Sequence, residues 1–450
     1  MDYILALLQW YSGISHEAMT WYVTHTSAIL DTLHIGFQAA FDALLLVTTC
    51  LAVLYVLLSL LVLVVRPRTK RYAFDPKRAP RITVHIPTRN ELAALRCAAA
   101  CLAWDYPADK IQILIGDDSD DPRVSAGLAM FAKRNPRVRV IKRPVNEGYK
   151  AGNLNNMLTH TTGDILLVFD SDYLPGPDFA RRIVAPFQHD KRIVAVQARW
   201  KPINKRETFS ATLGFAITES FHQVFLPFMH WVGGSVMLCG SAEAVRVADL
   251  KRLGGWQHGS LTEDIEYALR LHRNGHHVVY LHDLTCGMEV PNTPKDLYRQ
   301  QMRWAFGVVN ALRDHAWGIF WSRGRVTVAR KCNTLVLFPS GYLLTTLILL
   351  LFTTGILAFF THPPGPFNLA LFVTQTAKNI AFTSGLLATF IVGMCLGGRW
   401  RSIPKLIVAM FSIGFVVTYY VNRGVWRALR KGKMQWFLVK KEGNAHRRAR

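Results

Sequence analysis

The chain has 450 residues, of which 50% are hydrophobic and 18% charged, and its 53 Lys and Arg against 30 Asp and Glu give a formal net charge of +23. This apolar and aromatic content excludes a mainly disordered chain. No zinc-finger or RNA-binding signature accompanies the basic charge, so we expect no nucleic-acid partner. The apolar residues are gathered in blocks, which is typical of a protein with membrane-spanning helices.

The first apolar block lies near the N-terminus. Residues 43–65 contain no charge and are long enough to cross a hydrocarbon core of about 30 Å, so we predict a transmembrane helix over 41–65. Segment 1–40 mixes aromatic and acidic residues and predicts either a second span or an interfacial helix. Four basic residues follow the span: Arg66, Arg68, Lys70 and Arg71. By the positive-inside rule they place the middle of the chain in the cytosol.

Three more apolar blocks follow the middle section. Residues 331–360 and 379–398 are predicted transmembrane helices. The block within 402–430 is shorter, and a third C-terminal span there would carry the basic tail 431–450 outside, against the positive-inside rule. We therefore favour an interfacial helix over 402–430 and a cytosolic tail, in a multi-pass protein embedded in the lipid bilayer of the cell membrane.

Between residues 66 and 330, short β-branched runs alternate with helical ones. The strand-like runs are RITVHIP, IQILIGDDS, VRVIKRP, DILLVFDSD and IVAVQARW. This alternation predicts a mostly parallel α/β sheet with helices on its faces. Ligands of such sheets bind at the carboxyl ends of the strands, and acidic residues of this sequence cluster there.

Two acidic groups end predicted strands. Asp117 and Asp118 lie in GDDSDD, for which a solvated Asp-rich turn is an equally good explanation. Asp170 and Asp172 follow the apolar run DILLVF, and two carboxylates at i and i+2 suit a Mg²⁺ or Mn²⁺ ion that bridges a diphosphate. A strand-terminal turn is the alternative for this pair.

Two further groups lie on predicted helices. In SLTEDIEYALRLHRNG the periodicity puts Thr262, Glu263 and Asp264 at a helix N-terminus, where capping accounts for the first two and leaves Asp264 available as a general base. In YRQQMRWAFG, Gln300 and Arg303 share a helix face beside Trp304. A tryptophan there offers a flat wall for a sugar ring, and an amphipathic helix with a buried Trp is the alternative.

In this order and spacing, these motifs resemble those of the processive family-2 glycosyltransferases of the cellulose synthase, hyaluronan synthase and mannan synthase type. The resemblance runs from about residue 81 to residue 304. It implies a Rossmann-like GT-A catalytic domain over 66–330, a nucleotide-sugar donor, a growing glycan acceptor and metal-dependent inverting transfer. By the same resemblance, Asp117 or Asp118 recognises the nucleotide base, Asp170 and Asp172 hold metal and diphosphate, and Asp264 is the catalytic base.

The resemblance also assigns the remaining site residues. Lys150, in NEGYKAGNLN, matches a diphosphate-contacting lysine, and Gln300, Arg303 and Trp304 match residues that hold the diphosphate and the acceptor. The expected acceptor side consists of Cys239, Gly240, Ser241 and Glu263, together with Trp304. The tail WFLVKKEG resembles a gating loop, with Lys440 where threonine is expected; its residues are Trp436, Phe437, Val439, Lys440 and Lys441.

The resemblance leaves the donor sugar open. The CGS segment at 239–241 favours UDP-glucose, whereas the VPNTP segment and the short tail favour GDP-mannose. We expect an enzyme that elongates a β-linked polysaccharide from UDP-glucose and moves it across the membrane. The alternatives are a GDP-mannose-dependent mannan or glucomannan synthase, a UDP-N-acetylglucosamine-dependent synthase, a single-sugar glycolipid transferase, and a non-catalytic membrane scaffold.

Overall fold

The computed structural model describes residues 2–65, 70–233, 235–322, 324, 326–361 and 368–434. The chain divides into two compact units. One consists of Met1–Leu54 and Leu343–Gly385, and the other of Tyr55–Tyr342 and Leu386–Arg450. The expected gating loop at 436–441 lies outside the described residues.

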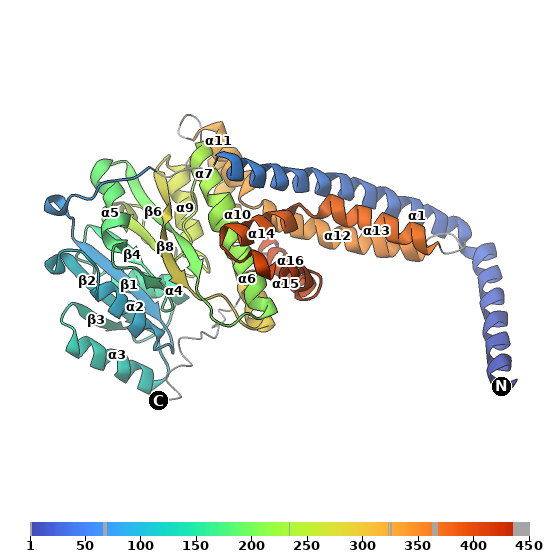
Figure 1. The fold of residues 1–450 in the computed structure, drawn as a ribbon, viewed down its shortest axis with the longest axis horizontal. Coiled ribbons are helices and arrows are strands. Elements are labelled where there is room, and N and C mark those ends of the chain that lie inside the picture. The colour runs from blue at the N-terminus through green and yellow to red at the C-terminus, as the bar shows by residue number, and fades with distance from the viewer. Residues whose placement is uncertain are drawn as a thin grey trace. The chain divides into compact units, whose positions relative to one another are not determined.

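The larger unit is built around one eight-stranded sheet of order β3-β2-β1-β4-β7-β6-β8-β5 (Figure 1). Its strands are β1 (Ile82–Thr88), β2 (Ile111–Asp117), β3 (Val138–Lys142), β4 (Ile165–Val168), β5 (Leu174–Pro175), β6 (Ile193–Pro202), β7 (Glu243–Arg246) and β8 (His277–Met288). All five runs predicted as strands form strands. The sheet is mixed, because β7 is antiparallel to both β4 and β6, and β5 is antiparallel to β8.

Both faces of the sheet are buried. Along β4, Ile165 and Leu167 belong to the core on one face, and Leu166 and Val168 to the core on the other, as the two-residue period of a strand requires. The covering helices are α2 (Ala93–Leu102), α3 (Pro122–Arg134), α4 (Tyr149–Leu158), α5 (Phe179–His189), α8 (Val247–Arg252) and α9 (Glu263–Arg273). The helices α2, α3 and α5 pack on the first face, and α4, α8 and α9 on the second.

A second group of helices continues the larger unit beyond the sheet. It contains α6 (Phe209–Ser220), the π-helical turn Phe221–Phe225, α7 (Leu226–Gly233), α10 (Pro294–Phe320), α11 (Val328–Cys332), the π-helical turn Asn333–Leu337, α14 (Gly385–Leu396), α15 (Ile403–Met410) and α16 (Ile413–Leu429). The helix α10 packs along both α9 and α16. Gly424 permits the close approach of α16, because a Cβ there would lie 2.4 Å from the Met302 carbonyl oxygen of α10. Short 3₁₀ turns cover Pro76–Arg78, Ala108–Lys110 and Trp400–Ser402.

Two apolar helical segments are long enough to cross a membrane, Ile29–Val65 and Val328–Thr361. The first belongs to α1 (Asp2–Val65), which also contains most of segment 1–40 as continuous helix. The second contains α11, the turn Asn333–Leu337 and α12 (Ser340–Thr361).

Two predicted single helices are each divided, which corrects the sequence analysis. The predicted span 379–398 is interrupted at Ser384, between α13 (Leu369–Thr383) and α14. The predicted interfacial helix over 402–430 bends by 64° after Met410. At that bend the Ser412 hydroxyl donates to the Val408 carbonyl at 2.6 Å, so the side chain satisfies an acceptor that the interrupted helix leaves open.

Candidate active site

Lys150 joins three of the predicted motifs. It lies near the start of α4, and its Nζ is 2.8 Å from Asp170 Oδ1 and 3.1 Å from Glu263 Oε1. The same ammonium donates to the Gly240 carbonyl at 2.6 Å. Burial lowers the pKa of Lys150, but the carboxylates of Asp170, Glu263 and Asp264 outweigh burial and raise it. The lysine is therefore a fixed positive charge among acidic groups.

The DSD segment follows β4 and is held from several sides. The Asp170 backbone N–H donates to Ser241 Oγ at 3.0 Å, and the side chain of Asp170 is 35% exposed. Asp172 is buried, and its Oδ2 accepts the Glu289 backbone N–H at 3.2 Å. Ser171, between them, donates its hydroxyl to the Glu91 carboxylate. The two aspartates thus have fixed and different surroundings.

The acidic pair fits a divalent cation only together with ligands from outside the protein. Among the described residues, no group of three or more His, Cys, Asp or Glu side chains forms a ready-made metal cage. Two carboxylates beside a diphosphate and water are the usual oxygen ligands of Mg²⁺ in nucleotide enzymes. Asp170 and Asp172 would therefore hold the metal jointly with donor phosphates.

The TED segment opens α9, as the periodicity predicts, but Thr262 does not cap it. The Thr262 hydroxyl is buried and has no hydrogen-bond partner in the described part of the chain. Its side chain instead packs against Gly307 of α10, where a Cβ would lie 2.4 Å from Thr262 Cγ2. Glu263 pairs with Lys150, as given above. The capping interpretation of Thr262 is therefore wrong, and packing against α10 accounts for the residue.

Asp264 has the surroundings of a general base. Its exposed fraction is 9%. Burial, followed by the repulsion of Glu263, raises the pKa of Asp264 from an ordinary 3.8 to about 7, and Lys150 opposes the shift. A carboxyl group with a pKa near neutrality can accept a proton and later release it to solvent.

The CGS segment passes close to this carboxylate. Gly240 has a φ of +78°, and a Cβ there would lie 2.9 Å from Asp264 Oδ2 and 3.1 Å from Lys150 Nζ. The backbone N–H groups of Cys239 and Gly240 donate to Glu243 Oε2 at 3.2 and 2.9 Å. Glycine is required here both for the left-handed backbone and for the close approach.

Arg303 and Trp304 reach the cluster from α10. Arg303 donates to the Leu261 carbonyl at 3.2 Å. Burial lowers the pKa of Arg303, while Glu263, Asp170 and Asp264 act against that shift, so Arg303 lies within electrostatic reach of the cluster. The Trp304 ring lies 6.4 Å from that of Trp200, whose indole N–H donates to the Ser241 carbonyl at 2.9 Å.

Not every predicted residue joins the cluster through a described contact. Asp117 accepts from the Ser119 backbone N–H at 2.9 Å and from the Ser125 hydroxyl at 2.5 Å. Asp118 makes a two-pronged pair with Arg143, with both bonds at 2.7 Å. For the half-buried Gln300, no described hydrogen bond leads to Lys150 or Asp264.

The second half of GDDSDD is structural. Asp120 accepts from Arg89 at 2.8 Å, and Asp121 caps α3 by accepting the Arg123 backbone N–H at 2.9 Å. For these two residues the turn interpretation is confirmed.

Several polar residues of the site were not singled out from the sequence. Glu91 holds Ser171, Glu289 holds Asp172 through its backbone, and Arg96 pairs with Glu289 at 2.8 Å. Glu243 is buried, and burial raises its pKa to about 8, with Asp264 adding to the shift. Glu91 follows the first strand, and its position after the carboxyl end of that strand could have marked it as a site residue. No sequence feature marked Glu243 as a site residue, since it occurs inside a short apolar run.

The sheet, with these motifs gathered at the strand ends, defines a GT-A domain. Residues 80–307, about half of the chain, match the family described as "Glycosyltransferase like family 2". The chain belongs to this family.

Curated relatives of the chain include plant enzymes. It is 32% identical to glucomannan 4-beta-mannosyltransferase 2 of Arabidopsis thaliana over 54% of this chain and 49% of the relative. It is 29% identical to glucomannan 4-beta-mannosyltransferase 9 of the same plant, over 63% and 56%. The chain thus spans about half the length of the curated relatives it matches.

A solved structure shares the fold. It is a mannosyltransferase from Pyrobaculum calidifontis in complex with GDP-Man and Mn²⁺, with a TM-score of 0.60 and 18% identity, and the match covers 90% of this chain and all of that one. The expectation of a family-2 glycosyltransferase with a GT-A fold is therefore confirmed.

Proposed function

We propose that this protein is a membrane-embedded inverting glycosyltransferase that elongates a β-linked polysaccharide from a nucleotide sugar. The observation that carries the proposal is the set of contacts by which Lys150 joins the DSD, CGS and TED segments. These segments supply a diphosphate site, an acceptor loop and a proton acceptor. The two helices long enough to cross a membrane support the membrane assignment.

The donor that we propose is GDP-mannose, which replaces UDP-glucose as the first choice. The relatives' names describe mannosyl transfer to glucomannan, whereas only the short CGS segment favoured UDP-glucose. A mannan or glucomannan is then the expected product.

Asp264 would accept the proton of the attacking hydroxyl. It is buried beside the backbone of Gly240, so an acceptor sugar lying on the CGS loop and against Trp304 would bring its hydroxyl to this carboxylate. The hydroxyl oxygen attacks the anomeric carbon from the face opposite the diphosphate, and the bond to the diphosphate breaks. One displacement of this kind inverts the anomeric configuration, and the proton stays on Asp264 until solvent removes it.

The diphosphate would lie against the positive groups of the cluster. Lys150 and Arg303 are held among carboxylates, so their charges are in position before a donor binds. Asp170 and Asp172 would bind Mg²⁺ or Mn²⁺ together with the phosphates. A bound divalent cation would offset the negative charge that develops on the leaving diphosphate.

A donor panel tests the proposal. The detergent-solubilised full chain is incubated with Mn²⁺ or Mg²⁺ and labelled GDP-mannose, UDP-glucose or UDP-N-acetylglucosamine, with manno-oligosaccharides as acceptors. We expect transfer from GDP-mannose to give products of increasing length. A single added sugar would favour the glycolipid-type transferase, and no transfer from any donor would favour a scaffold.

A further inference from the structure

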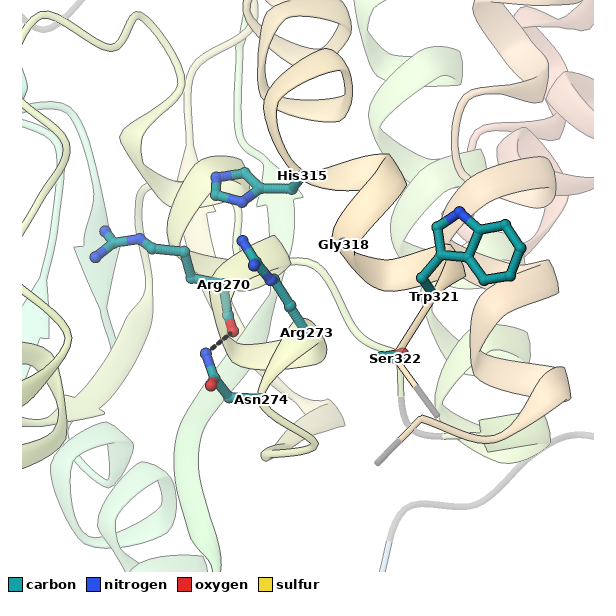
Figure 2. Close-up of a pocket in the computed structure, with 7 residues that line it drawn as sticks. All are labelled: Arg270, Arg273, Asn274, His315, Gly318, Trp321 and Ser322. Atoms are coloured by element: carbon teal, nitrogen blue, oxygen red, sulfur yellow. Dashed lines mark hydrogen bonds between the residues drawn. The ribbon is translucent and has the colours of Figure 1, made fainter. Parts of the chain in front are cut away.

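A second site lies apart from the residues described above, where α9 and α10 end. A cavity of about 500 Å³ opens there, lined by Arg273, His315, Gly318, Trp321 and Ser322 among others (Figure 2). None of these residues belongs to the cluster around Lys150. The proposed transferase reaction therefore gives no reason for a cavity at this place.

The cavity contains two arginines with different surroundings. Arg270 donates to the carbonyls of Leu253 and Gly255 at 2.5 and 2.7 Å and pairs with Glu266 at 2.8 Å. Glu266 also accepts from His315 at 2.9 Å. The guanidinium of Arg270 is thus paired within the protein. The carboxylate of Glu266 is also engaged, by Arg270 and His315.

Arg273 carries the unused charge. Its side chain is exposed, and within the described ranges of the chain no carboxylate forms an ion pair with it. It lies across α10 at Gly318, where a Cβ would be 2.7 Å from Nε and 2.8 Å from Cζ of the guanidinium. Figure 2 shows this side chain reaching toward His315 along the wall of the cavity. The absence of a side chain at Gly318 therefore allows this placement of the cation.

The exposed ring of Trp321 lines the cavity, and two further exposed aromatic rings lie next to it. The exposed fractions of Trp317, Phe320 and Trp321 are 73%, 54% and 52%. The Trp321 ring lies 5.5 Å from that of Trp317 and 5.1 Å from that of Phe320, so the three form one aromatic edge. Tryptophan rings are enriched at the level of lipid headgroups, where one side is apolar and the other wet.

The aromatic edge is joined to the start of an apolar span. Lys331, on α11, donates to the Phe320 carbonyl at 2.7 Å. The helix α11 opens the segment Val328–Thr361, which is long enough to cross a membrane. Val328, at its first position, is 77% exposed. The cavity and its aromatic edge therefore lie beside the start of a segment that is long enough to cross a membrane.

We propose that this cavity binds the phosphate of an anionic phospholipid headgroup. Arg273 pairs with the phosphate, and the aromatic edge packs against the glycerol and the first acyl carbons of the same lipid. A free phosphate ion would pair with Arg273 but would leave the rings of the aromatic edge without a packing partner. The occupant that satisfies both is a lipid of the surrounding membrane.

The test uses the delipidated full chain in detergent and measures binding of short-chain phosphatidylglycerol and phosphatidylcholine. We expect a preference of about fivefold for the anionic lipid, since one arginine near an anionic headgroup has an effect of about that size. Arg273→Gln should abolish the preference, and Arg273→Lys should keep part of it. Gly318→Leu should also abolish it, because the larger side chain displaces the guanidinium while leaving its charge.

The control is Arg134→Gln, which removes another exposed arginine, at the end of α3. This variant should retain the preference, and retained nucleotide binding will show that each variant is folded. Equal losses in Arg134→Gln and Arg273→Gln would refute the site, as would an unchanged preference in Arg273→Gln. If millimolar inorganic phosphate displaced phosphatidylglycerol completely, the site would be a phosphate site and the lipid assignment would be wrong.

Discussion

Lys150 and Glu263 lie 3.1 Å apart, and this pair connects two motifs that are far apart in the sequence. The lysine comes from α4 and the glutamate from the first residue of α9, so two helices on the same face of the sheet supply them. Lys150 also pairs with Asp170 and lies near Asp264. Its positive charge therefore offsets the mutual repulsion of the three carboxyl groups. The charged residues of the transfer site that we propose interact with one another. Replacing different ones should nevertheless impair different steps, either binding of the nucleotide or transfer of the sugar.

Asp264→Asn should nearly abolish transfer while leaving the donor bound. The amide keeps the shape of the carboxyl group but cannot accept the hydroxyl proton, and loss of a general base typically costs about 10² to 10⁴ in rate. Transfer from the donor and the affinity for its nucleoside diphosphate should be measured in parallel. Asp314→Asn, which changes an exposed carboxylate on α10, is the matched control. Transfer by Asp264→Asn at the wild-type rate would contradict the assignment.

The transfer rate should rise with pH through about 7. Burial and Glu263 raise the pKa of Asp264 to about 7, and only the ionised carboxylate can accept a proton. An initial-rate series at saturating donor would reveal this limb. If the rate were flat between about pH 6 and 8, Asp264 would not be the group that limits transfer.

Asp172→Asn should weaken metal-linked binding of the nucleotide rather than the chemical step alone. Asp172 is buried, and we expect affinity for the nucleoside diphosphate in Mn²⁺ to fall by about tenfold or more, as loss of even supporting contacts does at metal sites. Calorimetry with and without Mn²⁺ measures the linkage. Asp178, an exposed carboxylate directly before α5, provides the control, Asp178→Asn. Unchanged Mn²⁺-linked affinity in Asp172→Asn would favour the turn interpretation of DSD.

Glu243 should make the protein less stable as the pH rises. Its pKa is raised from 4.5 to about 8 by burial, so the folded state favours the protonated form. The stability it contributes is complete below about pH 4.5 and is lost as the pH rises through about 8. Glu243→Gln removes this titration, so the variant should gain thermal stability over the wild type at about pH 9 relative to about pH 6. A melting-temperature difference that does not change with pH would contradict the raised pKa.

Much of the architecture could be predicted from local sequence. The runs that form β1, β2, β4 and β6 are rich in aliphatic residues and buried on both faces, so their hydrophobic pattern is strong. The strand β7 was missed because EAVR is short and begins with a charged residue. The breaks in the two divided helices were also missed, because hydropathy detects an apolar run but not an interruption such as that at Ser384.

The site was predicted in part, and the reason lies in the range of the contacts. Asp170, Asp172 and Asp264 follow or open regular elements, so their positions at the strand ends and at a helix start could be inferred. Glu91 reaches Ser171 across 80 positions of sequence, and no local pattern encodes such a pair. The raised pKa of Asp264 could not be predicted from the sequence either, because a pKa near 7 depends on burial and on neighbours from other elements.

Gly240→Ala should stop transfer without unfolding the protein. Gly240 has a φ of +78°, and alanine in a left-handed conformation costs about 1–2 kcal/mol. Gly254→Ala is the matched control, because Gly254 has a φ of +92° but no atom lies within 4 Å of the place that a Cβ would take there. Both variants should lose similar thermal stability. Only the methyl group at residue 240 meets Asp264 Oδ2 and Lys150 Nζ, so only Gly240→Ala should lose transfer, and equal activity losses in the two variants would trace the effect to backbone strain alone.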